Sequence, residues 1–287
     1  MTLESLADRF WKKTNEVQPT VATVRGVHDY DDQLPAFDDE WVAGMSSAFR
    51  GILEDARAIT EEGLDTQEKI TRSLLIHQCV SRTHLVETPF LLASVDPFLG
   101  PHTRLLSETR QNTVQNIEQA NALLDRYASV PAFLQSALSI HRKCADAGQA
   151  PAAASLNRVL SQLDGYLASN LDDDPFLVLD VPGDDTAWRE RAEDLVTGTI
   201  RPAIEAYRNG LTEHIAPVAR PDDRCGLTWM DGGDEIYAHL VEQYTQLSMP
   251  PQEIHDVGQR WATEINAGEW VDIGEKAFGV NSMEAVF

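Results

Sequence analysis

The chain has 287 residues, 43% of them hydrophobic, and its 46 acidic residues outnumber its 23 basic residues, which gives a net charge of −23. This is enough apolar material for one large folded domain or two, and no apolar run approaches the roughly 20 residues that cross a membrane. The charge argues against nucleic acids and anionic membrane surfaces as partners, because both are bound through Lys and Arg.

The cysteines and the N-terminus bear on the compartment. Cys79, Cys144 and Cys225 are widely spaced and odd in number, which fits a reducing compartment better than a disulfide framework or a metal knuckle. The first residues, MTLESLADRFWKK, lack the apolar core of a signal peptide. We therefore expect a cytoplasmic protein, in which Cys225 is a buried thiol.

Apolar periodicity predicts helices throughout the chain, with no internal repeat. The expected helices span residues 2–17, 38–62, 66–92, 107–127, 131–147, 151–167, 188–211, 236–244 and 251–265. Thr2 and Ser107 are expected as helix caps, and Ile70, Leu74, His77, Ser81 and Leu85 are expected to share one face of their helix. Short joints between the helices from 107 to 167 imply antiparallel neighbours.

The remaining stretches are expected to be irregular. Residues 18–37 and 93–106 lose the helical period, and residues 176–181 form a short strand or an extended connection. Pro202 lies inside a long helix, where it should cause a kink. After Gly268 the helical register weakens, and residues 282–287 look like a new helix that is cut short.

Three clusters of metal-ligating residue types occur, and a structural role is favoured for each. Asp29, Asp31 and Asp32 lack the alternation of an EF-hand and fit a turn, although His28 and Tyr30 beside them are candidates for a functional role. His77 and His84 are seven residues apart without a carboxylate at the zincin position, so packed or surface histidines are expected. Residues 172–174 resemble an Asp-rich terpene synthase motif only weakly, because Pro175 follows at once.

The stretch from 226 to 265 contains two amphipathic helices joined by Pro250-Pro251 and shows no complete active site. Together with earlier pieces it resembles the bacterial family known as domain of unknown function 885. The pieces that carry the resemblance are residues 6–11, 26–35 and 97–101, Gly226-Leu227, Gly232-Gly233, Tyr237, Thr245, Pro251, Glu253, Ile254, His255 and Gly258. They cover nearly the whole chain in a consistent order.

That family is thought to consist of gluzincin-type zinc peptidases, so the resemblance implies zinc and a peptide substrate for the intact protein. Its members are much longer, and their H-E-x-x-x-H-H-type zinc segment lies beyond Phe287. No His-Glu pair occurs in this chain. The resemblance therefore implies no metal ligand and no catalytic residue here. It suggests Tyr237, Tyr244 and His255 as residues that line a substrate cleft, although aromatic residues at helical spacing are more often core.

The expected fold class is all-α: a multi-helix array of largely antiparallel helices with a few irregular loops, which the resemblance makes a zincin-like N-terminal lobe. Residues 1–287 are expected to form a single helical domain, the N-terminal part of a longer protein. The first functional hypothesis is the N-terminal helical half of a zinc-dependent peptidase, with the C-terminal half of the same protein as partner. The alternative is a non-catalytic helical binding or scaffold protein.

Overall fold

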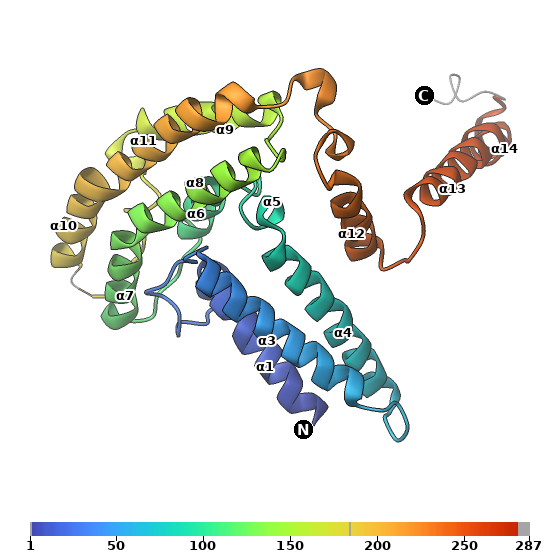
Figure 1. The fold of residues 1–287 in the computed structure, drawn as a ribbon, viewed down its shortest axis with the longest axis horizontal. Coiled ribbons are helices and arrows are strands. Elements are labelled where there is room, and N and C mark those ends of the chain that lie inside the picture. Colours follow the sequence, from blue (N-terminus) through green and yellow to red (C-terminus); the bar gives the residue numbers. More distant parts are fainter. Residues whose placement is uncertain (1, 184, 281–287) are drawn as a thin grey trace. The chain divides into compact units, whose positions relative to one another are not determined.

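The computed structural model describes residues 2–183 and 185–280, and over these residues the protein is built of helices (Figure 1). No strand occurs in these ranges; a single isolated bridge pairs Ala152 with Arg220. The expected all-α array is therefore confirmed. None of the helices in these ranges is long and apolar enough to cross a membrane.

Contacts between Cα atoms divide the chain into two compact units, Met1–Gly233 and Asp234–Phe287. Each unit is described by itself below. The expected single domain over residues 1–287 stays a prediction, because a division by contacts does not test whether the units fold separately.

The first unit begins with three long helices and one short helix. They are α1 (Leu3–Val17), α2 (Pro19–Val24), α3 (Asp39–Ala58) and α4 (Thr66–Glu87). The helices α1, α3 and α4 pack together, and α3 and α4 run antiparallel (Figure 1). Side chains in the starting turns fix their beginnings: Thr2 caps α1 as expected, Asp38 caps α3, and Asp65 with Glu68 forms a capping box on α4.

Two expectations in this region are wrong, and the packing of α4 adds a third finding. The stretch 18–37 contains the short helix α2, because Pro19 is well placed in a first helical turn. The third helix ends at Glu87, and Pro89 begins a separate helix, α5 (Pro89–Leu92). The buried face of α4 is formed by Leu75, Cys79, Thr83 and Val86, whereas Ile70 and Leu74 are 49% and 47% exposed.

A second group of helices forms the larger core of the first unit. Its elements are α6 (Pro101–Thr109), α7 (Ile117–Ala128), α8 (Val130–Asp146), α9 (Ala153–Leu167), α10 (Thr186–Leu195) and α11 (Arg201–Gly210). Ser107 lies inside α6, so the expected cap is wrong; α7 is capped instead by Asn116. Phe176, Leu179 and Val181 are buried in this core from a connection without strand structure.

The helix around Pro202 shows how the chain accommodates a proline. A π-helical turn at Val196–Ile200 joins α10 to α11, and Pro202 lies in the first turn of α11. The wider π-helical turn accommodates Pro202, which has no backbone amide hydrogen to donate. A second π-helical turn, Leu211–Ile215, follows α11. Short 3₁₀ turns complete the unit at Leu171–Asp173, Ala216–Val218, Asp222–Arg224 and Leu227–Trp229.

The second unit continues the chain as helices. They are α12 (Gly233–Thr245), which starts at the boundary, α13 (Pro251–Glu264), the π-helical turn Ile265–Glu269, and α14 (Trp270–Phe278). The two helices expected from 236 to 265 are confirmed. The expected loss of register after Gly268 is wrong, because α14 runs through Gly274 and ends at Gly279, whose φ of 71° is typical of a helix end. The helix start expected at 282–287 lies outside the described residues.

Gly100 is expected to be intolerant of a side chain. A Cβ at this position would lie 2.4 Å from the carbonyl oxygen of Asp96, with which the Gly100 amide forms a hydrogen bond of 2.9 Å. Because the clash is with backbone, Gly100→Ala should lower the free energy of unfolding by about 1–3 kcal/mol in urea titrations. The matched control Gly165→Ala has open space in α9 and should raise it by about 0.5–1 kcal/mol. Equal effects of the two changes would contradict this account.

Candidate functional site

The three residues predicted to line a substrate cleft all belong to the second unit. Tyr237 and Tyr244 lie on α12 and are 49% and 75% exposed, and His255 is exposed on α13. Their exposure shows that neither tyrosine is a core residue. Whether they contact a substrate stays a prediction.

The first unit contains a largely apolar cavity of about 60 Å³. Its lining comes from α1, α2, the loop before α3, α3, α4, α5, α6 with the loop before it, and α8. The lining residues are Val17, Gln18, Thr20, Leu34, Pro35, Phe37, Trp41, Leu85, Leu91, Leu92, Leu99, Pro101, Arg104, Leu105, Glu108 and Phe133. Leu99 is 65% exposed, so the cavity reaches the surface beside it. An apolar cavity with a few polar groups is typical of a small-molecule site.

The polar lining is concentrated on α2 and α6. The hydroxyl of Thr20 donates to Glu108, and Nε of Arg104 donates to the same carboxylate at 3.3 Å. With its amide oxygen facing the arginines, Gln18 accepts from Nη2 of Arg104 at 3.2 Å and from Nη1 of Arg82 at 3.3 Å. Two guanidinium groups therefore converge on one neutral oxygen at the edge of an apolar cavity.

Arg82, on α4, is the unusual member of this group. Burial lowers its pKa, and the charges of Arg25 and Arg104 lower it further. Among the ion pairs of the described ranges, none includes Arg82. The chain has a net charge of −23, yet three arginines lie close together here. Among the described residues, Glu108 is the only acid that pairs with one of them.

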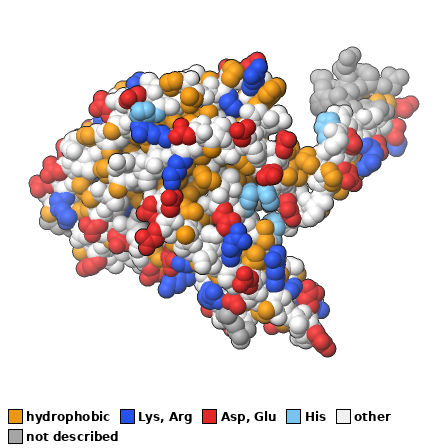
Figure 2. Space-filling model, in the orientation of Figure 1, with side chains coloured by type: hydrophobic (Ala, Val, Ile, Leu, Met, Phe, Trp, Pro, Cys, Tyr) orange, Lys and Arg blue, Asp and Glu red, His pale blue; other side chains and the backbone are white. Residues whose placement is uncertain are grey.

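The wider surface gives a contrast to this local excess of arginine. On the face that Figure 2 presents, acidic, basic and hydrophobic side chains are interspersed over the first unit. Mixed charge of this kind serves solubility and does not by itself indicate a binding site. The arginines around Gln18 are therefore better evidence of a site than the overall charge.

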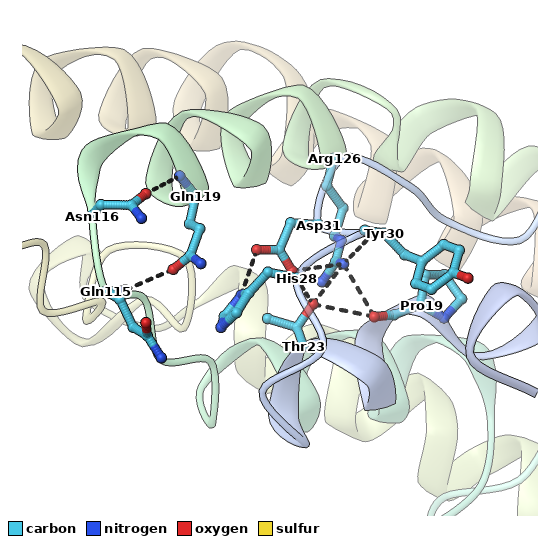
Figure 3. A network of polar contacts seen from close by, with 9 residues as sticks. All are labelled: Pro19, Thr23, His28, Tyr30, Asp31, Gln115, Asn116, Gln119 and Arg126. Carbon is cyan, nitrogen blue, oxygen red and sulfur yellow. Dashed lines mark hydrogen bonds and ion pairs between the residues drawn. The ribbon is translucent and has the colours of Figure 1, made fainter. Parts of the chain in front are cut away.

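A buried polar network holds the elements that carry one side of the cavity (Figure 3). Arg126 of α7 is fully buried, and its Nη2 donates to the Thr23 hydroxyl at 2.8 Å, to the Tyr30 carbonyl at 2.8 Å and to the Pro19 carbonyl at 3.2 Å. Asp31 supplies the counter-charge, with its Oδ1 3.9 Å from Nη2. Burial lowers the pKa of Arg126, and the carboxylate of Asp31 opposes this shift.

Both carboxylate oxygens of Asp31 have a polar partner. The Thr23 hydroxyl lies 2.6 Å from Oδ1, and Nδ1 of His28 lies 2.8 Å from Oδ2 (Figure 3). The Asp cluster therefore does more than form a turn, because one member pairs with a buried arginine. By binding both α2 and the loop that follows, the network positions Gln18 and Thr20 on one side of the cavity and Leu34 and Pro35 on another.

Two further buried polar clusters lie in the larger core. His141 has its Nε2 2.8 Å from the Tyr207 hydroxyl, and the His102 ring lies 6.4 Å from the Tyr207 ring. Burial lowers the pKa of His141 to about 3 and also lowers the pKa of His102. In the second cluster Arg201 pairs with the buried Asp174 at 3.0 Å, and the Tyr166 hydroxyl donates to the same carboxylate at 2.9 Å. The last acid of the 172–174 triplet is thus a structural ion-pair partner.

The residues in place do not make a metal centre. Within the described ranges, no group of three or more His, Cys, Asp or Glu side chains is placed to hold a metal ion. The described residues therefore offer no set of side chains that fits the ligands of a zinc site. Of the cysteines, Cys79 and Cys144 are buried, and burial raises the pKa of each to about 11. Cys225 is exposed, so its expected burial is wrong.

A family model described as "Bacterial protein of unknown function (DUF885)" matches residues 19–287. The chain belongs to the DUF885 family. None of the curated proteins matches it. Among solved structures, the chain is similar to the one described as "the putative lipoprotein from Colwellia psychrerythraea", with a TM-score of 0.75 and 14% sequence identity over 96% of this chain. It spans about half, 51%, of the length of that protein. At this identity the likeness establishes the fold alone.

The cavity brings together two of the pieces on which the likeness to DUF885 was seen in the sequence. Leu34 and Pro35 come from residues 26–35, and Leu99 and Pro101 come from residues 97–101. Arg82, Gln18 and Arg126 were not expected, because an isolated arginine on an amphipathic helix gives no sign that it turns inward. The one available signal was Pro19, which follows Gln18 and starts a helix.

Loss of the Asp31 charge should destabilise this DUF885 chain. Asp31→Asn would leave the Arg126 guanidinium buried without a counter-ion, so we expect the free energy of unfolding to fall by about 3–5 kcal/mol. The exposed neighbour serves as the control, and Asp29→Asn should change it by less than about 0.5 kcal/mol. Urea titrations followed by circular dichroism measure both. A loss below about 1 kcal/mol for Asp31→Asn would show that the ion pair does not hold the loop.

Burial of His141 predicts a loss of stability in acid. The folded state keeps this imidazole neutral down to a pKa of about 3, whereas the unfolded chain takes up a proton at the ordinary pKa of 6.5. Below pH 6.5 the unfolded state therefore binds more protons, and the free energy of unfolding falls by up to about 1.4 kcal/mol per pH unit until the pH nears 3. His141→Gln removes this contribution. The stability difference between wild type and variant should shrink from pH 7 to pH 4, and a constant difference would contradict the assignment.

Proposed function

We propose that this DUF885 chain is the N-terminal helical half of a zinc-dependent peptidase, to which it contributes the scaffold and a ligand-binding wall but not the metal centre. In this proposal the metal ligands and the general base are supplied by the C-terminal half of the same protein. A peptide is the substrate. The observation that carries the proposal is an apolar cavity with converging guanidinium groups, to whose lining two of the segments with the family resemblance contribute.

Two further observations support this division of labour. The chain spans 51% of the solved protein whose fold it shares, so the architecture exists as part of a longer protein. The second unit exposes large apolar side chains on successive helices, namely Tyr244, Trp261, Ile273 and Phe278. Exposed apolar side chains in this number are typical of a surface that another part of a protein covers.

The predicted cleft residues have a defined place in the proposal. Tyr237, Tyr244 and His255 offer hydroxyl and imidazole groups that can hold a substrate carbonyl. Because all three lie in the second unit, they would act with the C-terminal half and need not meet the cavity of the first unit. We place the protein in the cytoplasm, with nucleic acid and membranes excluded as partners by its charge. This placement rests on sequence composition.

The alternative function is a non-catalytic helical binding protein. It is supported by the cavity of the first unit, because a ligand site alone is enough for a binding protein. The two functions differ in one measurable property, which is the activity of the product of the longer coding region. A peptidase gains zinc and hydrolysis with that region, whereas a binding protein does not.

We expect the 287-residue chain to take up less than stoichiometric zinc and to cleave no peptide. The product of the longer coding region should hold one zinc per chain and cleave a peptide library in a zinc-dependent manner. Elemental analysis after gel filtration and mass spectrometry of the library measure the two properties. One tightly held zinc in the 287-residue chain would contradict the proposed division. A longer product without zinc or hydrolysis would favour the binding protein.

A further inference from the structure

The cavity and the arginines beside it define the chemistry of a ligand. The cavity is small: at about 60 Å³ it is less than half of the roughly 150 Å³ of an engineered cavity that binds benzene. It therefore suits a group smaller than an aromatic ring. Most of its lining is aliphatic or aromatic, including Val17, Leu34, Leu105 and Phe133. A short aliphatic group, such as the side chain of valine or leucine, fits such a space.

The charges at the polar edge of the cavity favour binding of an anion. Nη1 of Arg82 and Nη2 of Arg104 both reach the amide oxygen of Gln18, so two cations share one neutral acceptor. Glu108 pairs with Arg104 through Nε and also takes the Thr20 hydroxyl, and no carboxylate pairs with Arg82 among the described residues. The arrangement leaves like charges facing one another, and burial together with the charges of Arg25 and Arg104 lowers the pKa of Arg82. A carboxylate beside Gln18 would relieve this repulsion and gain charge-assisted hydrogen bonds.

We infer that the first unit binds a carboxylate that carries a short aliphatic group, with the carboxylate between Arg82 and Arg104 and the aliphatic group in the cavity. Two sources share this chemistry. One is the carboxyl end of a peptide that terminates in valine or leucine, and the other is a free aliphatic acid. If the ligand is the carboxyl end of a peptide, the inference rests on the proposed peptidase function. Binding of an aliphatic carboxylate does not itself depend on that function.

The test is titration calorimetry of the 287-residue chain with a matched ligand series. N-acetyl-leucine should bind saturably, and N-acetyl-leucinamide, which lacks the carboxylate, should bind at least about tenfold more weakly. N-acetylglycine, which lacks the aliphatic group, should also bind more weakly. Comparison of the peptide Ala-Ala-Leu with isovalerate then distinguishes the two sources. Equal affinity for N-acetyl-leucine and its amide, or no saturation by any carboxylate at millimolar concentrations, would overturn the inference.

Matched variants locate the binding site. Arg82→Gln and Arg104→Gln should each weaken N-acetyl-leucine binding at least about tenfold, whereas Arg158→Gln, an exposed arginine on α9, should leave it unchanged. Leu99→Trp should obstruct the mouth of the cavity, and Phe98→Trp, which changes the exposed neighbouring residue outside the lining, should not. Helical circular dichroism checks that each variant is folded. Saturable binding that all of these variants retain would place the ligand elsewhere and contradict the inference.

The outcomes separate this inference from the proposed function. Carboxylate binding by the 287-residue chain, with no zinc in the longer product, would retain the site and remove the peptidase. Zinc-dependent cleavage by the longer product, with no carboxylate binding here, would retain the peptidase and remove the site.

Discussion

The cavity depends on the ion pair and hydrogen bonds of the buried Arg126 guanidinium. Removing a guanidinium from water is unfavourable by several kcal/mol, and one carboxylate and three acceptors around Nη2 offset part of this cost, whereas Nε and Nη1 have no hydrogen-bond partner among the described residues. Those partners come from α2 and from the loop around Tyr30, whereas the arginine comes from α7, about 100 residues later in the chain. The ion pair therefore fixes α2 and the loop that follows it, and this segment forms one side of the cavity.

The same physics explains why the two arginine sites differ. Arg126 has a buried counter-charge and hydrogen bonds with several elements, which suits a structural role. Arg82 has a neutral partner and two arginine neighbours, which is a poor arrangement for stability. Unfavourable electrostatics that the fold does not compensate are common at functional sites, because the ligand supplies the missing charge. The contrast between these two residues points to the cavity edge more directly than apolar area alone.

Much of the fold could be predicted from the sequence, since apolar periodicity and caps such as Thr2 reflect local physics. Errors arose where tertiary packing overrode local pattern. Ile70 and Leu74 share one face of α4, but the packing of α4 against α1 and α3 buries Leu75 and Cys79 on another face. Similarly, Ser107 is a good capping residue, yet Pro101 starts α6 earlier and places Ser107 inside the helix.

The candidate site was much less predictable, and the reason is long-range pairing. Arg82 and Gln18 are 64 positions apart, and nothing in either local sequence indicates that they share an oxygen with Arg104. The aromatic residues of α12 are predicted cleft residues because of a family resemblance, and they do not form a complete active site. A cavity whose walls come from eight segments exists only after folding, so its chemistry has to be argued from the three-dimensional structure. For the same reason, a cluster of positive charge in a strongly acidic chain indicates a binding site only when its three-dimensional position is known. Here the cluster lies beside a cavity that a ligand can enter.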